Sequence, residues 1–344
     1  MVTGYIICGI MSAITMYFST KITLRLANKW GFYDTQSRQK KPQQKVPLLG
    51  GLALIITIAL NTMMFIDQSS SIFITGLIGA CFIFGIGLID DKYSLQAGIK
   101  LLSQVMIVSF VWFNGVSIDY ISVPFATKAI VFSPVMSFIV TQLWMCTIIN
   151  IFNLIDGVDG LAIGVSFITA LMLFIISISV SPVFVSFMLV SIAGASLAFL
   201  KFNFHPAKMY LGDSGSLLLG YLFAFCSVVG VMKSTISIIV IGFIFAYPFI
   251  DLVLSIIRRL IQKKHVFSPD LLHIHHQLVR RGISVKKAVL ILYTICGCFG
   301  GGAILISLKQ SDPIRYILIT VFLACVVIYF ASLQVSKKRF KSLK

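Results

Sequence analysis

Eleven stretches of apolar residues, each long enough to cross a lipid bilayer as a helix, dominate the sequence. A spanning helix needs about 20 consecutive apolar residues. The stretches cover residues 2–20, 48–66, 71–89, 100–117, 129–149, 161–180, 182–200, 215–232, 236–257, 288–307 and 314–334. Pro134 and Pro248 fall inside two of them, which neighbouring membrane helices can tolerate. We therefore expect an all-α fold: a polytopic transmembrane helical bundle of about 11 spans that forms one integral membrane domain over residues 1–344.

The composition excludes a soluble globular domain. Charged residues make up 11% of the chain and hydrophobic residues 58%, whereas a soluble domain carries about 25% charged residues. The net charge of +17 raises the question of nucleic-acid binding. However, the basic residues lie in short connections between apolar stretches, with no clustered basic face or arm, so no nucleic-acid partner is expected. The seven cysteines lie within or beside apolar stretches and are interpreted as packing residues.

The basic residues also predict the orientation of the chain. All but four of the 28 lysines and arginines lie in alternate connections; the exceptions are Lys128, Lys233, Lys309 and Arg315. By the positive-inside rule the basic side is cytoplasmic, with the N-terminus outside and the C-terminus inside. The cytoplasmic side then holds the tail after Val335 and the catalytic loops 21–47, 90–100, 150–160, 201–214 and 258–287.

Most of the carboxylates fall on this predicted cytoplasmic side. All eleven acidic residues are aspartate, and carboxylates near membrane-helix ends are costly unless they serve a function. The first pair is Asp90 and Asp91, predicted to be catalytic. Neighbours on a helix point about 100° apart, so one can face a metal or substrate while the other takes a backbone or basic partner. Helix capping and a surface pair with Lys92 are the alternative.

A second segment repeats amides and carboxylates every third or fourth residue. If it is helical, one face carries all four side chains, and oxygen ligands of this kind suit Mg²⁺. A simple turn containing two Asp-Gly steps is the alternative. The four residues are Asn150, Asn153, Asp156 and Asp159.

A third segment, residues 202–216, ends where an apolar stretch begins. Amides at a helix N-terminus, together with Lys208, are expected to cradle a diphosphate while Asp213 holds a metal. An N-capping role is the alternative.

The fourth segment joins His273, His275 and His276 to Arg280, a combination suited to diphosphate recognition. A zinc site is less favoured because no cysteine lies nearby. Lys45, in the first basic loop, is a further candidate for phosphate binding.

Taken in order, these segments resemble the polyprenyl-phosphate N-acetylhexosamine-1-phosphate transferases, most closely the WecA-like enzymes of the MraY superfamily. The resemblance runs from about Arg38 to Arg281. It implies transfer of GlcNAc-1-phosphate from UDP-GlcNAc to undecaprenyl phosphate, giving undecaprenyl-diphosphate-GlcNAc and UMP, the priming step of O-antigen or common-antigen-type glycan synthesis. The implied location is the bacterial cell (inner) membrane, with the active site at the cytoplasmic face, in contact with membrane lipids. Whether the chain is a homodimer stays open.

The resemblance also implies roles for the residues. Mg²⁺ is the implied cofactor, with Mn²⁺ as a substitute, and Asn153 and Asp213 are its implied ligands. Asp90, with Asp91 beside it, is the implied base or lipid-phosphate partner, and Asp156 and Asp159 are active-site carboxylates. The motif His273-Ile274-His275-His276 favours UDP-GlcNAc, because the peptidoglycan translocases usually carry three consecutive histidines there. Substrate contacts are expected from Lys45, Asn150, Lys208, His273, His275, His276 and Arg280.

Two departures and two rival functions remain. Pro42 and Leu271 stand where family members often carry His and Arg, so Lys41, Lys45 or Arg280 would have to supply those phosphate contacts.

Another UDP-HexNAc is the alternative donor, and direct displacement is favoured over a phospho-aspartate intermediate. The rival class is a transporter of lipid-linked glycans. A transporter places ionisable residues in mid-span, where this chain offers only Asp251.

Overall fold

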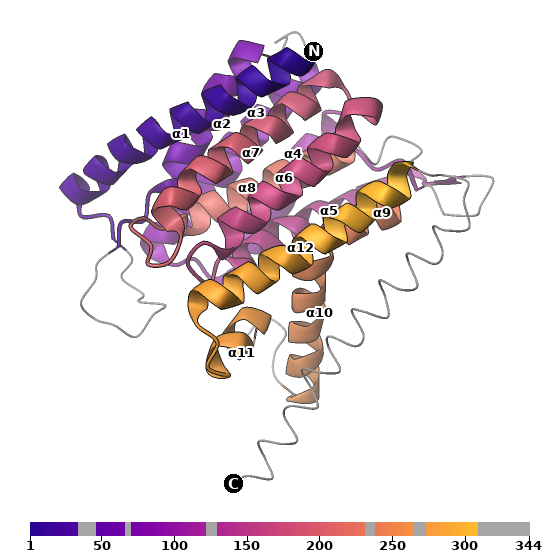
Figure 1. Ribbon diagram of the computed structural model, residues 1–344. Coiled ribbons are helices and arrows are strands. Elements are labelled where there is room, and N and C mark those ends of the chain that lie inside the picture. The colour runs from indigo at the N-terminus through magenta and orange to yellow at the C-terminus, as the bar shows by residue number, and fades with distance from the viewer. Residues whose placement is uncertain (34–45, 66–69, 122–128, 231–237, 264–272, 309–344) are drawn as a thin grey trace.

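The computed structural model describes residues 1–33, 46–65, 70–121, 129–230, 238–263 and 273–308 (Figure 1). Within these ranges the regular structure is helical apart from one antiparallel strand pair, in which Tyr120 pairs with Val131, and a single antiparallel bridge between Tyr33 and Pro47. The elements are α1 (Val2–Trp30), α2 (Gly50–Phe65), α3 (Ser71–Tyr93), α4 (Ala97–Phe113), β1 (Tyr120–Ile121), β2 (Ile130–Val131), α5 (Pro134–Ile155), α6 (Leu161–Val180), α7 (Val183–Asn203), α8 (Gly212–Val229), α9 (Ile238–Ile244), α10 (Ala246–Ile261), α11 (Ile274–Arg280) and α12 (Val285–Leu308).

Seven of these helices are long and apolar enough to cross a membrane: α1, α3, α5, α6, α7, α8 and α12. Helices α2 and α4 are apolar but shorter, at 16 and 17 residues. The prediction of an all-α, polytopic membrane protein is therefore confirmed. The count of eleven spans and the orientation stay predictions, because the expected last span, 314–334, lies outside the described residues.

One predicted span, residues 236–257, is not a continuous helix. Helix α9 ends at Ile244 and α10 begins at Ala246, with Phe245 between them. Pro248 has no amide proton to donate to the carbonyl of Ile244 four residues earlier, which explains a break at this point. Figure 1 shows α10 projecting from one end of the bundle, so the predicted span 236–257 is broken at Phe245 and does not form one helix.

The start of α5 also differs from the prediction. The expected span 129–149 begins as strand β2, and the helix starts only at Pro134. The hydroxyl of Ser133 accepts a hydrogen bond from the amide of Met136, and proline occupies the first helical position. Both features are typical of a helix N-terminus. The helix then continues to Ile155, which carries Asn150 and Asn153 on helical backbone to the polar end of the bundle.

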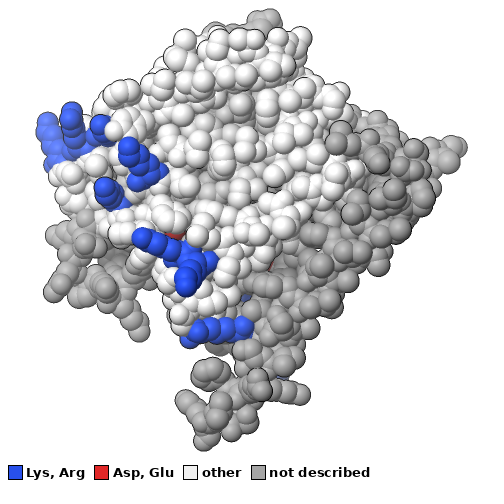
Figure 2. All heavy atoms as spheres, in the orientation of Figure 1, with Lys and Arg blue, Asp and Glu red and all other residues white. Residues whose placement is uncertain are grey.

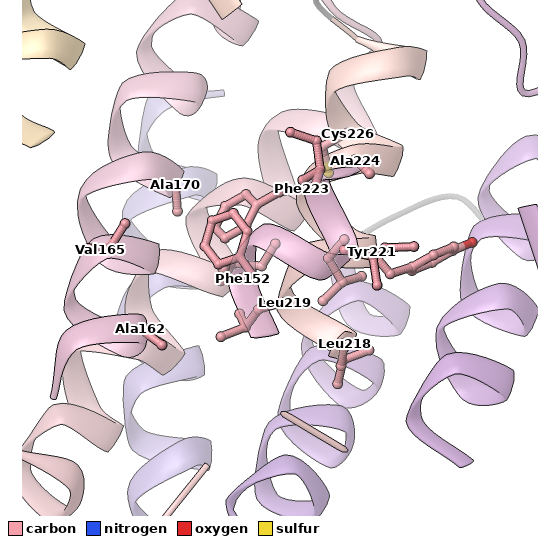
Figure 3. Close-up of a cluster of buried hydrophobic side chains, with 14 of the residues drawn as sticks. Phe152, Ala162, Val165, Ala170, Leu218, Leu219, Tyr221, Phe223, Ala224 and Cys226 are labelled. Atoms are coloured by element: carbon pink, nitrogen blue, oxygen red, sulfur yellow. The ribbon is translucent and has the colours of Figure 1, made fainter. Parts of the chain in front are cut away.

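Helix α8 forms the centre of the bundle. Almost every residue from Gly212 to Val229 is buried, as expected for a helix that is apolar on all sides. Figure 3 shows Phe223 of α8 against Phe152 of α5, whose ring centroids lie 4.8 Å apart. On another side the hydroxyl of Tyr221 donates to the carbonyl of Gly76 on α3 at 3.1 Å. The position of α8 therefore sets the positions of α3 and α5 around it.

Glycines allow α2 and α3 to approach the start of α8 closely. A Cβ added to Gly87 of α3 would lie 2.4 Å from the Cα of Ser214, and one added to Gly51 of α2 would lie 2.5 Å from the amide nitrogen of Gly215. Small residues at helix contacts are a common basis of packing in membranes, where lipid is as apolar as the side chains. The backbone of α8 is thereby brought next to the end of α3.

We expect Gly87→Ala to destabilise the protein by about 1–3 kcal/mol, because the added methyl group would meet backbone that cannot move aside. Gly85 of the same helix has nothing within 4 Å of an added Cβ, so Gly85→Ala is the matched control. Thermal unfolding of the two detergent-purified variants is the measurement. Equal unfolding temperatures would contradict the proposed close contact between α3 and α8.

Candidate active site

The two adjacent aspartates at the end of α3 have different partners. One oxygen of Asp90 accepts a hydrogen bond from the amide of Leu95 at 2.8 Å, and the other lies 2.5 Å from Nζ of Lys100. Both oxygens of Asp91 accept backbone amides of α8, from Asp213 at 2.6 Å and Ser214 at 3.0 Å. The expected backbone or basic partner is found for both aspartates. The expectation that one of them faces a metal or substrate stays a prediction.

The carboxylate of Asp91 occupies the N-terminus of α8. A negative charge is favourable there because the first amides of a helix lack intrahelical acceptors and the helix dipole is positive at that end. Gly212 precedes these amides with a φ of +78°, and a Cβ there would lie 2.7 Å from an oxygen of Asp91. The expectation that these amides cradle a diphosphate is therefore wrong for Asp213 and Ser214, whose amides already bind a carboxylate of the protein.

Lys100, in the first turn of α4, is surrounded by oxygen atoms from three other helices. Its Nζ lies 2.5 Å from Asp90, 3.6 Å from Asp213 and 3.2 Å from the side-chain oxygen of Asn153. The side-chain nitrogen of Asn153 (Nδ2) donates to the carboxylate of Asp213 at 2.5 Å and to the hydroxyl of Ser216 at 3.0 Å. The structure thus brings Asp90, Asn153 and Asp213 together, as predicted, around a lysine that sequence reasoning missed.

A second polar contact continues along the same two helices. The side chain of Asn150 donates to Gln104 at 2.6 Å, one turn beyond Lys100 on α4. It also donates to the carbonyl of Cys146 at 2.8 Å. Lys100 and Gln104 are four residues apart, which places both on the face of α4 that meets α5. This spacing at the start of an apolar span is the signal that would have predicted Lys100 and Gln104.

Asp156 and Asp159 do not continue the helical face. Helix α5 ends at Ile155, and Asp156 is its C-terminal cap, so only Asn150 and Asn153 of the predicted four lie on the helix. Asp159 lies in the turn that follows. One of its oxygens is 2.8 Å from Nδ1 of His205 and accepts the amide of Ala207 at 3.1 Å. Asp159 therefore joins the turn after α5 to the loop after α7.

The histidine segment is anchored on α10. Asp251 is fully buried; one of its oxygens lies 3.0 Å from Nδ1 of His273, and the other accepts the amide of Ile274 at 2.9 Å. From the sequence, Asp251 was weighed only as the mid-span carboxylate that a transporter would use. The ring of His275 lies 4.3 Å from that of His276, and a Cβ added to Gly157 would lie 2.9 Å from Nε2 of His275. The histidines thus meet the turn that follows α5.

His275 is the most deeply buried of the three imidazoles, with 1% of its surface exposed. Among the described residues neither of its ring nitrogens has a hydrogen-bond partner. Burial, together with the neighbouring His276, lowers the pKa of His275 to about 3. The imidazole is therefore neutral at physiological pH, and it can accept or donate one hydrogen bond without introducing a charge.

The remaining predicted substrate residues lie apart from this cluster. Lys208 and Arg280 are exposed, and neither forms a salt bridge within the described part of the chain. Lys45, and also Pro42 and Leu271, lie outside the described residues. The structure therefore brings together Asp90, Asp91, Asn153 and Asp213, places the histidines against the neighbouring turn, and leaves Lys208 and Arg280 on the surface.

The cluster has the chemistry of a site for a small divalent cation. Three acidic side chains, Asp90, Asp91 and Asp213, lie around one ammonium group and one helix N-terminus, so acidic groups outnumber basic side chains here. The ammonium of Lys100 shows that a cation fits among these oxygens. Within the described ranges no three His, Cys or Asp side chains form a metal-binding group by themselves. Mg²⁺ commonly takes one or two carboxylates and completes its shell with water and substrate phosphates, which fits Asp213 with Asn153.

The fold and the site define an integral membrane protein with a polar, cation-suited cluster at one end of an apolar bundle. Residues 73–231 match the family described as Glycosyl transferase family 4. The probable undecaprenyl-phosphate N-acetylglucosaminyl 1-phosphate transferase of Bacillus subtilis is 34% identical over 88% of this chain and 85% of its own length. The decaprenyl-phosphate N-acetylglucosaminephosphotransferase of Mycobacterium tuberculosis is 31% identical over 86% and 80%. The phospho-N-acetylmuramoyl-pentapeptide-transferase of Staphylococcus epidermidis is 30% identical over 76% and 84%.

The chain therefore belongs to glycosyl transferase family 4. Its predicted place among the WecA-like polyprenyl-phosphate N-acetylhexosamine-1-phosphate transferases of the MraY superfamily is confirmed, as is the prediction of a membrane-bound glycosyltransferase.

The low pKa of His275 predicts a loss of stability in acid. The unfolded chain takes up a proton below pH 6.5, whereas the buried imidazole stays neutral down to about pH 3. Stability present above pH 6.5 is therefore lost as the pH falls, by about 1.4 kcal/mol per unit. We expect the unfolding temperature of His275→Leu to fall less between pH 7.5 and pH 5.5 than that of the wild type. Parallel curves for the two proteins would show that His275 is not the cause.

Proposed function

We propose that the protein transfers GlcNAc-1-phosphate from UDP-GlcNAc to undecaprenyl phosphate, releasing UMP and forming undecaprenyl-diphosphate-GlcNAc. The observation that carries the proposal is the convergence of Asp90, Lys100, Asn153 and Asp213 from four helices at one end of the bundle. The Bacillus and Mycobacterium relatives are named as an undecaprenyl-phosphate N-acetylglucosaminyl 1-phosphate transferase and a decaprenyl-phosphate N-acetylglucosaminephosphotransferase. These names support the sugar and the lipid acceptor.

The chemical difficulty of this reaction is charge. An oxygen of the lipid phosphate attacks the β-phosphorus of UDP-GlcNAc, the bond to the bridging oxygen breaks, and UMP leaves with the electron pair. Both reactants are anions, so a cation between them lowers their repulsion. Lys100 supplies one positive charge at the cluster. Asp213 and Asn153 would hold Mg²⁺, or Mn²⁺ in its place, which supplies Lewis-acid stabilisation of the phosphate charges.

Asp90 is the proposed general base. It lies next to Lys100, and its position is fixed by the amide of Leu95. A carboxylate held this way can take the proton of a singly ionised lipid phosphate as that phosphate attacks. Asp91 has a different proposed task, because both of its oxygens bind α8: it positions Asp213. A direct displacement needs no further nucleophile.

The histidine segment is the proposed contact for the nucleotide diphosphate. His275 and His276 lie against the Gly157 turn, close in sequence to Asn153, and His273 stacks on His275. A different UDP-HexNAc remains the alternative donor, since the relatives include a phospho-N-acetylmuramoyl-pentapeptide-transferase. The transporter alternative loses its main support, because Asp251 binds His273 and the start of α11. The contacts of Asp251 with His273 and Ile274 give this buried carboxylate a structural role, so no transport role is needed to explain it.

The proposed setting follows from the distribution of charge along the chain. The excess of basic residues on one side favours an active site at the cytoplasmic face of the bacterial cell (inner) membrane. The lipid phosphate lies at headgroup depth, which agrees with a cluster at helix ends. The product would start a cell-surface glycan of the O-antigen or common-antigen type.

The proposal is tested with a panel of radiolabelled UDP-sugars, followed by lipid extraction. We expect label to enter the lipid phase from UDP-GlcNAc, with UMP released, only when polyprenyl phosphate and Mg²⁺ are both present. Asp213→Asn should lower kcat by a factor of at least about 10². Asp119→Asn is the control, since Asp119 follows the far end of α4. Equal activity of the Asp213 and Asp119 variants would refute the role of Asp213, and labelling from another sugar alone would refute the donor.

A separate prediction concerns Asp90. Asp90→Asn keeps the shape of the side chain and removes the base, so turnover should fall while the dissociation constant for UDP-GlcNAc changes by less than about threefold. Isothermal titration with the nucleotide sugar and a UMP-release assay measure the two quantities. Lost nucleotide binding with unchanged turnover per bound substrate would assign Asp90 to binding instead.

A further inference from the structure

The last third of α1 carries a stripe of basic residues. Lys21, Arg25 and Lys29 recur every fourth residue, so they share one face of the helix, and all three are exposed. Earlier turns of α1 expose apolar side chains instead, among them Ile14 at 47% and Phe18 at 57%. The change from exposed apolar to exposed basic side chains marks the level at which the helix leaves the hydrocarbon and enters the headgroup region.

Helix α7 brings a fourth basic residue to the same place. Helices α1 and α7 pack side by side, with the hydroxyl of Ser12 donating to the carbonyl of Ser191 at 2.6 Å. Lys201, in the last turn of α7, has its Nζ 5.1 Å from the centre of the Tyr17 ring, and Nζ of Lys21 lies 4.5 Å from the same ring. Two ammonium groups from different helices are thus held on one aromatic side chain.

No acidic side chain balances this charge in the part of the chain that the structure describes. Lys21, Arg25, Lys29 and Lys201 form no salt bridge there. Figure 2 shows lysine and arginine side chains gathered at the edge of the molecule where α1 ends, without aspartate among the outermost of them. Like charges repel, and an anion between these ammonium groups would relieve the repulsion. The arrangement therefore calls for a negatively charged ligand.

We propose that Lys21 and Lys201, on either helix beside Tyr17, bind the phosphate of an anionic phospholipid, with Arg25 as a further contact. The apolar face of α1 continues directly into the basic stripe, so the acyl chains of the lipid would lie along Ile14 while its headgroup reaches the lysines. A soluble anion would gain nothing from that apolar face. Helix α1 contributes none of the residues of the candidate active site, so this is a separate site, whose ligand holds α1 against α7.

The test is native mass spectrometry of the detergent-purified full chain, titrated with phosphatidylglycerol or with phosphatidylcholine of the same acyl chains. Each basic residue near an anionic lipid surface contributes about a fivefold change in binding. We therefore expect Lys21→Gln/Lys201→Gln to weaken phosphatidylglycerol binding about 30-fold and to leave phosphatidylcholine binding unchanged. Lys286→Gln/Lys287→Gln is the matched control: it removes the same charge from two exposed lysines at the start of α12.

Three outcomes would overturn the proposal. No weakening in the Lys21/Lys201 variant would show that there is no site, and equal weakening in both variants would show an effect of net charge alone. Binding of undecaprenyl phosphate is expected to be unchanged by Lys21→Gln/Lys201→Gln. Its loss, with phosphatidylglycerol binding intact, would assign these lysines to the substrate.

Tyr17→Leu gives a second test should the double variant fail to fold. It keeps every charge and removes the ring that both lysines share, so binding of phosphatidylglycerol should weaken about threefold. Unchanged binding in this variant would contradict the role of the shared ring and, with it, the proposed geometry.

Discussion

The hydrogen bonds from the first two amides of α8 to the carboxylate of Asp91 fix the relation between α3 and α8, and the other polar contacts at this end of the bundle depend on that relation. They place Asp213 beside Asn153 and leave Asp90 facing Lys100. The contact is possible because Gly87 lets the two backbones meet. A carboxylate on helix amides is a strong, charge-assisted contact where little water competes.

This arrangement divides two neighbouring carboxylates between structure and chemistry. Asp91 has both oxygens occupied by the backbone of α8, whereas Asp90 has one oxygen on the amide of Leu95 and the other beside Lys100. With Asp213 the cluster holds three carboxyl groups and one ammonium group, and a divalent cation would offset the remaining negative charge. An excess of negative charge at the end of an apolar bundle is costly unless a cationic partner is bound. The same imbalance would draw Mg²⁺ and, through it, the phosphates of the substrates.

Much of this could be predicted from the sequence, because its strongest signals are local. Apolar length predicts the helices, and the 100° step of a helix predicts that Asp90 and Asp91 point to different partners. Lys100 was missed because a lysine at the start of a span is typical of the membrane surface. Its four-residue spacing from Gln104 nevertheless puts both on one helix face, as the three-residue spacing of Asn150 and Asn153 does. His273, the partner of Asp251, lies 22 residues further along the chain, at the N-terminal cap of α11, which no local pattern shows.

Two errors have the same physical origin. Pro248 was visible in the sequence, but whether a proline kinks or breaks a helix depends on what satisfies the freed carbonyl. The amides of α8 were expected to bind a ligand, and a carboxylate of the protein binds them instead. In both cases the local pattern was correct, and the identity of the partner was decided by the packing of distant segments.

The most direct measurement is the position of Mn²⁺ in crystals of the protein, located by anomalous scattering. The account predicts one strong peak about 2.0–2.3 Å from a carboxylate oxygen of Asp213, between Asn153 and Asp90. A peak bound only by the histidines, or the absence of any peak at this end of the bundle under conditions that support turnover, would contradict it.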